Sequence, residues 1–228
     1  MTTSPYTIIG TPFSTFTRSI TLALTYKGLP FNQVRCVPHS DTAYDNHPFG
    51  FLPTLVIHEI DGKPVNLKLR ESPAIARFID RVAPEPSLLI TPGHGKALIE
   101  EQMWEFVSLA SAHGLPAVEK GVVKPRVAAT DAGNLTDSEI REQIKPGVEH
   151  LQKFLHQMEE LMADDGYVFG SKLSWADFFL FPLLADLKAT PEGELLSPRL
   201  LKWMEEMNKL EAVQVTTPGT LSVGARPP

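Results

Sequence analysis

Cysteine is almost absent from the chain, and the single thiol, Cys36, excludes an intramolecular disulfide. Sparse cysteine is typical of proteins from a reducing compartment, and no Cys-x-x-Cys motif is present for thioredoxin-type redox chemistry. Runs of lysine or arginine are also missing. Because the net charge is −6 and the pI is about 5.6, nucleic acid is not an expected partner.

Long apolar runs are missing as well. No stretch approaches the roughly 20 residues that a membrane-spanning helix needs, and Met1–Pro5 does not lead a basic region into an apolar one, as a secretion signal does. The seven histidines lack the spacing of metal ligands. We therefore expect a cytoplasmic protein with no membrane partner and no metal.

The chain contains enough apolar sequence for a sizeable core. Its 228 residues are 43% hydrophobic, which suits one large domain or two small ones. Residues 1–83 alternate strand and helix patterns in the order β-α-β-loop-β-β-α. We expect strands at 6–9, 31–37, 55–60 and 65–69, and an irregular loop with at most one helical turn at 38–49. One helix is expected to begin after Ser14 or Thr15 and to stop at Gly28, and a second is expected after Ser72. This order predicts an α/β domain with helices on one side of a small mixed sheet.

A proline-rich linker, placed at residues 84–94, follows this first domain. Residues 95–228 show helical periodicity without an evident strand, so we expect an all-α second domain with a loose tail at Thr216–Pro228. Two capping-box motifs, Thr136–Glu139 and Ser174–Asp177, predict helix starts. Pro146 predicts a kink or break in the helix that follows the first of them.

Two segments of the first domain point to a binding site. Pro53 stands at the entry of a β-rich run, where a proline cannot donate to a sheet ladder. Downstream of an Asp61-Gly62 hairpin signal, Ser72 is the predicted N-cap of a helix, with Pro73 at its first position. The N–H groups and partial positive charge of such a helix end receive a carboxylate readily. The two segments therefore predict a site for an extended, anionic ligand.

The order of these features, about residues 6–210, resembles the cytosolic glutathione transferases. The resemblance implies a thioredoxin-like first domain in which the bond before Pro53 is cis and the backbone of Leu52 pairs with the cysteinyl unit of glutathione. It also implies that Glu71 and Ser72 hold the γ-glutamyl end, and that the Ser174–Asp177 box is the folding element of the helical domain. The alternative is that Ser72 only caps the helix and that Glu71 only interacts favourably with the helix dipole.

The first loop, Gly10–Arg18, looks like that of serine-type members, notably the phi and fungal phi-like classes. The resemblance assigns Ser14 the catalytic role of donating a hydrogen bond to the glutathione sulfur. Lowering a thiol pKa by about 2 units takes about 2.7 kcal/mol, which is the order that one hydroxyl and a helix dipole supply. The alternative is that Ser14 or Thr15 only caps the helix.

Two departures from the phi pattern stand beside this site. Phe51 replaces the usual glutamine, and the loop at 38–49 lacks the lysine that meets the glycine carboxylate of glutathione. His39 is the nearest substitute and His47 the second, unless each is a solvated loop histidine. Cys36 is expected to be a buried strand cysteine.

An electrophile pocket is expected between the two domains. Its candidate residues, each of which could equally be a core residue, are Phe13, Trp104, Val107 and Ser108. Arg77 and Arg81, with Asp80, either face a second copy in a homodimer, as the family does, or form a solvated helix face.

The function implied by the resemblance is conjugation of glutathione, as co-substrate, to small hydrophobic electrophiles, or reduction of peroxides with it. Two alternatives remain. One is a zeta-like glutathione-dependent isomerase, although the Ser-Ser-Cys start of that class is absent. The other is a non-catalytic protein on the same fold that binds hydrophobic ligands or regulates a partner.

Overall fold

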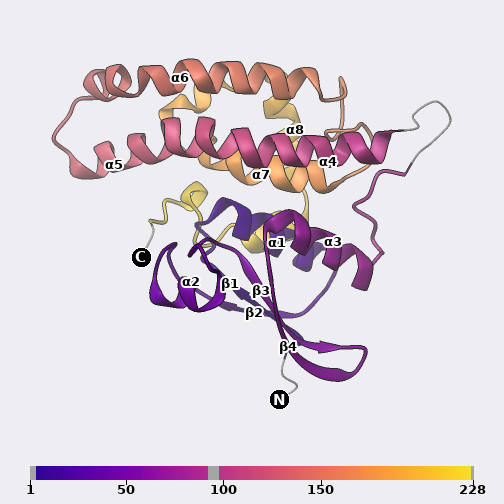
Figure 1. The fold of residues 1–228 in the computed structure, drawn as a ribbon. Helices are drawn as coiled ribbons and strands as arrows, with labels where there is room; N and C mark the ends of the chain where they lie inside the picture. The colour runs from indigo at the N-terminus through magenta and orange to yellow at the C-terminus, as the bar shows by residue number, and fades with distance from the viewer. Residues whose placement is uncertain (1–3, 92–97, 227–228) are drawn as a thin grey trace. The chain divides into compact units, whose positions relative to one another are not determined.

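A computed structural model describes residues 4–91 and 98–226, which divide into two compact units (Figure 1). The first unit comprises Met1–Leu88 together with Asn208–Pro228, and the second comprises Leu89–Met207. The expected helical domain, residues 95–228, is therefore too long, because its last 21 residues belong to the first unit. Residues 92–94 of the expected linker lie outside the described residues.

The first unit is built on a four-stranded sheet of order β2-β1-β3-β4. The strands are β1 (Tyr6–Ile9), β2 (Phe31–Val34), β3 (Thr54–Ile60) and β4 (Lys63–Arg70). β1 pairs parallel with β2 and antiparallel with β3, and β3 pairs antiparallel with β4. The predicted Asp61-Gly62 turn joins β3 to β4, with φ of 52° and 74° at its two residues, as a two-residue hairpin turn requires.

Helices cover both faces of this sheet, so the expectation of helices on one side only was wrong. α3 (Ser72–Val82) packs against α1 (Thr15–Tyr26), and the Tyr6 ring meets the Phe78 ring of α3 with centroids 6.0 Å apart. On the other face, Ala43 of the short helix α2 (Asp41–Asn46) is buried with Ile9 and Val56. Successive strand residues point to opposite faces, and apolar residues on both faces require cover on both.

α3 turns one of its charged residues inward. Asp80 is buried and pairs with Lys27 at 3.3 Å, and Lys27 also donates to the C=O groups of Ala83 and Pro86 at 2.8 and 2.9 Å. Asp80 therefore does not share an outward face with the exposed Arg77 and Arg81, which corrects the grouping made from the sequence.

The second unit is helical, as expected. Its elements are α4 (Ile99–Leu109), η1 (Ala110–Val123), α5 (Lys124–Ala132), α6 (Asp137–Glu160), α7 (Trp175–Lys188), η2 (Pro191–Leu195) and α8 (Pro198–Asn208). Between α6 and α7, an isolated bridge joins Tyr167 to Gly170. No helix among residues 4–91 and 98–226 is long and apolar enough to cross a membrane.

Pro146 was expected to kink or break its helix, but α6 is one unbroken helix from Asp137 to Glu160 (Figure 1). The break was therefore wrong, and the kink stays a prediction. Buried side chains lie on both sides of the proline, including Ile144 and Leu151, so packing outweighs one lost hydrogen bond. α6 packs against η1, whose 14 residues have π-helical geometry. π-helices are usually single turns, and no local sequence pattern announces one of this length.

The box at Ser174–Asp177 forms a capping box at the start of α7. One oxygen of the buried Asp177 accepts from the N–H and hydroxyl of Ser174, both at 2.9 Å. The other accepts from the Val168 N–H at 2.8 Å and the Trp203 indole N–H at 2.9 Å. Burial raises the pKa of this carboxyl group. One side chain thus ties α7, α8 and the preceding loop together.

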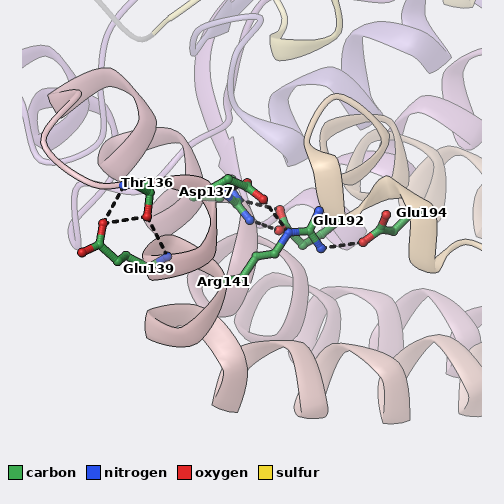
Figure 2. A network of polar contacts seen from close by, with 7 residues as sticks. Thr136, Asp137, Glu139, Arg141, Glu192 and Glu194 are labelled. Atoms are coloured by element: carbon green, nitrogen blue, oxygen red, sulfur yellow. Dashed lines mark hydrogen bonds and ion pairs between the residues drawn. The ribbon is translucent and has the colours of Figure 1, made fainter.

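A network of ion pairs links three further elements of the second unit (Figure 2). The buried Arg126 of α5 binds both carboxylate oxygens of the buried Glu192 in η2 and donates to Asp137 of α6 at 2.7 Å. Arg141 donates to Asp137 at 2.8 Å and to Glu194 at 2.6 Å. The predicted Thr136–Glu139 capping box is present beside this network.

The expected loose tail is structured as far as residue 226 and packs against other parts of the first unit, to which it belongs. Residues 208–226 contain α9 (Glu211–Thr216) and the short helix η3 (Leu221–Val223), and α9 packs against α1. Arg18 of α1 donates to the Thr217 hydroxyl at 3.1 Å. A Cβ at Gly219 would lie 3.3 Å from Pro12. The tail therefore contacts both α1 and the loop before it.

Candidate functional site

The loop between β1 and α1 is fixed at its first residue. The Gly10 N–H donates to the Val34 C=O at 2.9 Å, and the Gln33 side chain donates to the Gly10 C=O at 2.8 Å. A Cβ at Gly10 would lie 2.9 Å from the Thr17 methyl group, so glycine lets the loop cross closely over α1.

Ser14 ends this loop at the N-cap position of α1, with extended backbone angles of −82° and 120°. Its C=O accepts from the Arg18 N–H at 2.9 Å, but its side chain makes no capping hydrogen bond. Thr15 is the first helical residue and is buried. Neither side chain therefore caps α1, and the half-buried Ser14 hydroxyl stands at the positive end of the helix.

α3 begins one residue earlier than predicted. Glu71 is the N-cap, Ser72 the first helical residue and Pro73 the second, because the N–H groups of Ala74 and Ile75 donate to the Glu71 C=O at 2.9 and 3.0 Å. Glu71 has a φ of +66°. Such a conformation costs on the order of 1–3 kcal/mol in a residue other than glycine, and it is frequent at binding sites. The Glu71 side chain is 74% exposed, whereas Ser72 is buried.

The peptide bond between Leu52 and Pro53 is cis, as the resemblance implies. The ladder between β1 and β3 begins at Thr54, so the Leu52 backbone lies outside the sheet pairing. Its side chain packs on the small core cluster that contains Ile9 and Cys36. Cys36 follows β2 rather than lying in it, and burial raises the pKa of its thiol.

The two loop histidines have different surroundings. His39 is exposed, hydrogen-bonds through Nδ1 with the Tyr44 hydroxyl at 3.3 Å, and packs edge-on with Phe51 at 5.2 Å between centroids. His47 is buried, and its Nε2 lies 3.3 Å from Glu71 Oε1. The interpretation of His47 as a solvated histidine was therefore wrong. His39 as the contact for the glycine end of glutathione stays a prediction.

Sequence reasoning missed how α2 is held beside this site. Arg70 Nε donates to the Asn46 C=O at 2.7 Å, and Lys68 Nζ donates to the Asp45 C=O at 2.8 Å. Cations are favourable at helix C-termini. A signal was available, since residues 68 and 70 share one face of a strand, but the partner carbonyls cannot be read from the sequence.

The electrophile-pocket candidates belong to different units. Phe13 is half-buried in the first unit. In α4 of the second unit, Trp104 is half-buried, Ser108 is exposed and Val107 is part of the buried core. A cavity of about 640 Å³ in the second unit has none of these residues in its lining and is bounded instead by the α4 residues Gln102, Glu105 and Phe106 with the end of α6. The pocket between the domains stays a prediction.

Two family models match the chain. The glutathione S-transferase N-terminal domain matches residues 8–87, and the glutathione S-transferase C-terminal domain matches residues 127–206. The chain belongs to the glutathione S-transferase family. The family expected from the first loop, Pro53 and the Ser174–Asp177 box is thereby confirmed, and with it the assignment as a transferase.

Solved structures agree with this assignment. Glutathione transferase F7 from Populus trichocarpa is 25% identical, with a TM-score of 0.71 over 92% of this chain and 97% of that one. A family member from Pseudomonas fluorescens, solved with two glutathione bound, is 15% identical with a TM-score of 0.75 over 93% and 92%. A glutathione S-transferase from Rhodospirillum rubrum is 21% identical with a TM-score of 0.74 over 98% and 96%. The latter two show the fold alone, whereas the poplar likeness supports a phi-like transferase. No curated protein sequence matches the chain.

Proposed function

We propose that this transferase conjugates glutathione to small hydrophobic electrophiles by means of a thiolate that Ser14 stabilises. The observation that carries the proposal is the Ser14 hydroxyl, which stands at the N-cap of α1 without making a cap hydrogen bond. An O–H group in that position can donate to a sulfur anion, and the helix dipole favours the same negative charge. The reaction then needs little more than a bound electrophile close to the sulfur.

The remaining residues of the site suit the rest of the tripeptide. Glu71 offers an exposed carboxylate to the γ-glutamyl ammonium, and Ser72 offers its hydroxyl and helix N-terminus to the α-carboxylate. Leu52, with its backbone outside the sheet ladder, supports pairing with the cysteinyl unit. His39 is the proposed partner of the glycine carboxylate, and the electrophile would meet Phe13 and the α4 residues Trp104 and Ser108.

The test is the ultraviolet absorbance of the thiolate of bound glutathione at neutral pH. Ser14→Ala should reduce the thiolate fraction by about tenfold or more, because the thiol pKa returns towards its ordinary value near 8.5. Conjugation of a chloronitrobenzene probe should fall with it. Ser19→Ala, which removes another hydroxyl from α1, one that donates to the Thr15 C=O, is the matched control and should leave the thiolate signal unchanged.

Tight glutathione binding without a thiolate signal in the unaltered protein would contradict the catalytic proposal and favour the non-catalytic reading. Peroxide reduction should be assayed with the same variants, because a stabilised thiolate serves either reaction. A buried single cysteine suits a cytoplasmic setting.

We also propose that two copies of the chain associate through the first unit. Leu67 of β4 is 52% exposed, and the strand forms, with α3, a cavity of about 540 Å³ whose lining includes Leu67, Arg77 and Arg81. The Arg81 guanidinium lies 5.5 Å from the centre of the Phe78 ring. An apolar hollow with exposed arginines at one patch is typical of a protein–protein interface.

A further inference from the structure

His47 has both of its ring nitrogens engaged, one by the backbone and one by Glu71. The Phe49 N–H donates to Nδ1 at 3.1 Å, and Nε2 lies 3.3 Å from Glu71 Oε1. A nitrogen that accepts a hydrogen bond carries no proton, so the neutral ring bears its proton on Nε2. His47 therefore donates to the Glu71 carboxylate.

The surroundings of His47 hold its ring in one orientation. The side chain is only 3% exposed, and the rings of Phe49 and Phe51 lie against it with centroids 6.1 and 5.8 Å away. The His47 N–H donates to the Ala43 C=O at 2.8 Å, and the preceding residue is bound by Arg70, as described above. A donor fixed in this way can fix the group that it contacts.

Glu71 needs such support more than most carboxylates. Its side chain is 74% exposed, and a free glutamate is among the side chains that lose the most rotamer entropy when they are ordered. A ligand that must order the side chain itself binds more weakly than one that meets it already ordered. Because His47 contacts Oε1, the second oxygen, Oε2, remains to receive a ligand.

We propose that His47 is a positioning residue that orders the Glu71 carboxylate to meet the γ-glutamyl ammonium of glutathione. The inference rests on the proposed function, since it takes glutathione as the ligand. Phe51, which departs from the phi pattern, then has a role, because its ring packs against the ring of His47.

Substitutions can separate the hydrogen-bonding roles of the two ring nitrogens of His47. The amide oxygen of Asn can replace Nδ1 as acceptor for the Phe49 N–H but does not reach Glu71. The longer Gln can replace Nε2 as donor to Glu71 and gives up the backbone contact. A purely structural role in the loop predicts that His47→Gln is the more damaging change, whereas a positioning role predicts that His47→Asn is.

Calorimetric binding of glutathione should show the difference. His47→Asn should weaken binding by about tenfold or more, the loss expected for one hydrogen bond to a charged group. His47→Gln should stay within about twofold of the unaltered protein, and kcat at saturating glutathione should change little in either variant. Equal losses in both variants, or a larger loss in His47→Gln, would overturn the inference.

A glutathione analogue without the γ-glutamyl amino group provides a second readout. Because it lacks the ammonium that meets Glu71, its affinity should be the same for His47→Asn and the unaltered protein, and equal weakening of both ligands would mean a structural role. His156→Asn is the matched control, since His156 faces Glu160 at 3.4 Å on the exposed surface of α6. If the unaltered protein binds no glutathione, both the proposed function and this inference fail. If it binds glutathione and His47→Asn binds equally well, only the inference fails.

Discussion

Gly147 shows that the packing of two helices can depend on the absence of a side chain at one residue. It lies where α6 meets η1, and a Cβ at this position would come 2.7 Å from the carbonyl carbon and 3.1 Å from the Cα of Gly121. Both partners are backbone atoms, which cannot rotate away as a side chain can. The close contact of the two helices therefore requires glycine.

Gly147→Ala is predicted to destabilise the protein by about 2–3 kcal/mol through overpacking. In an exposed helix interior the same change would stabilise by up to about 1 kcal/mol, so even the sign of the effect is informative. Thermal or denaturant unfolding measures it, with Glu149→Ala, at an exposed position two residues further along α6, as the control. A stabilised Gly147→Ala variant would show that the crossing is looser than described.

At the scale of single residues, the sequence predicted those that act within a contiguous motif. It missed those whose contacts depend on the path of a loop. Pro53, the Ser14 loop and the Ser174–Asp177 box are recognisable because each motif is contiguous. Glu71 was identified, but its N-cap position was not, because its φ of +66° follows from the turn that joins β4 to α3. The contact between His47 and Glu71 spans 24 positions, and no spacing rule connects them.

Elements are joined in the second unit by charge as well as by apolar packing. Asp137, in the first turn of α6, accepts from Arg126 of α5 and from Arg141 one turn later. The hydrogen bond from Arg141, with the attraction of both guanidinium groups, lowers the pKa of Asp137 below its ordinary value of 3.8. A carboxylate whose pKa is lower in the folded state stabilises the fold above its unfolded pKa, and that contribution is lost as the pH falls.

Asp137→Asn is therefore predicted to lower the melting temperature near neutral pH and to have a smaller effect at about pH 3, where the aspartate is largely protonated once the protein unfolds. Melting curves at both pH values, compared with those of the exposed Asp164→Asn, measure the difference. An equal loss at both pH values would mean that the aspartate acts through packing rather than through its charge.

The sequence predicted well which helices and strands are present, but not where a helix continues or changes its geometry. The amphipathic face of α6 was visible in the sequence, but Pro146 suggested a break, because a local rule cannot weigh the packing against η1 that keeps the helix whole. Similarly, residues 95–228 were expected to form an all-α domain, and the change from α4 to π-helical geometry at Ala110 has no local signal. Tertiary packing decides such cases.

The whole molecule is predicted to be a dimer in solution. Leu67→Glu would place a charge on the apolar patch of the first unit, and burying an unpaired charge in an interface is costly. Sedimentation velocity should therefore show a shift from dimer to monomer for this variant. Val215→Glu, at a comparably exposed position on α9, should leave the assembly unchanged, and a monomeric unaltered protein would contradict the proposal.

The return of the last 21 residues to the first unit also bears on how the protein is made. During synthesis, residues 1–88 emerge before the second unit, whereas α9, which packs against α1, emerges after it. The second unit is continuous in the chain and can close as soon as it leaves the ribosome, whereas the first must wait with part of α1 uncovered. The domain that carries Ser14 is thus completed only after the whole second unit has been synthesised, so a polypeptide cut before residue 208 would leave the Ser14 domain incomplete.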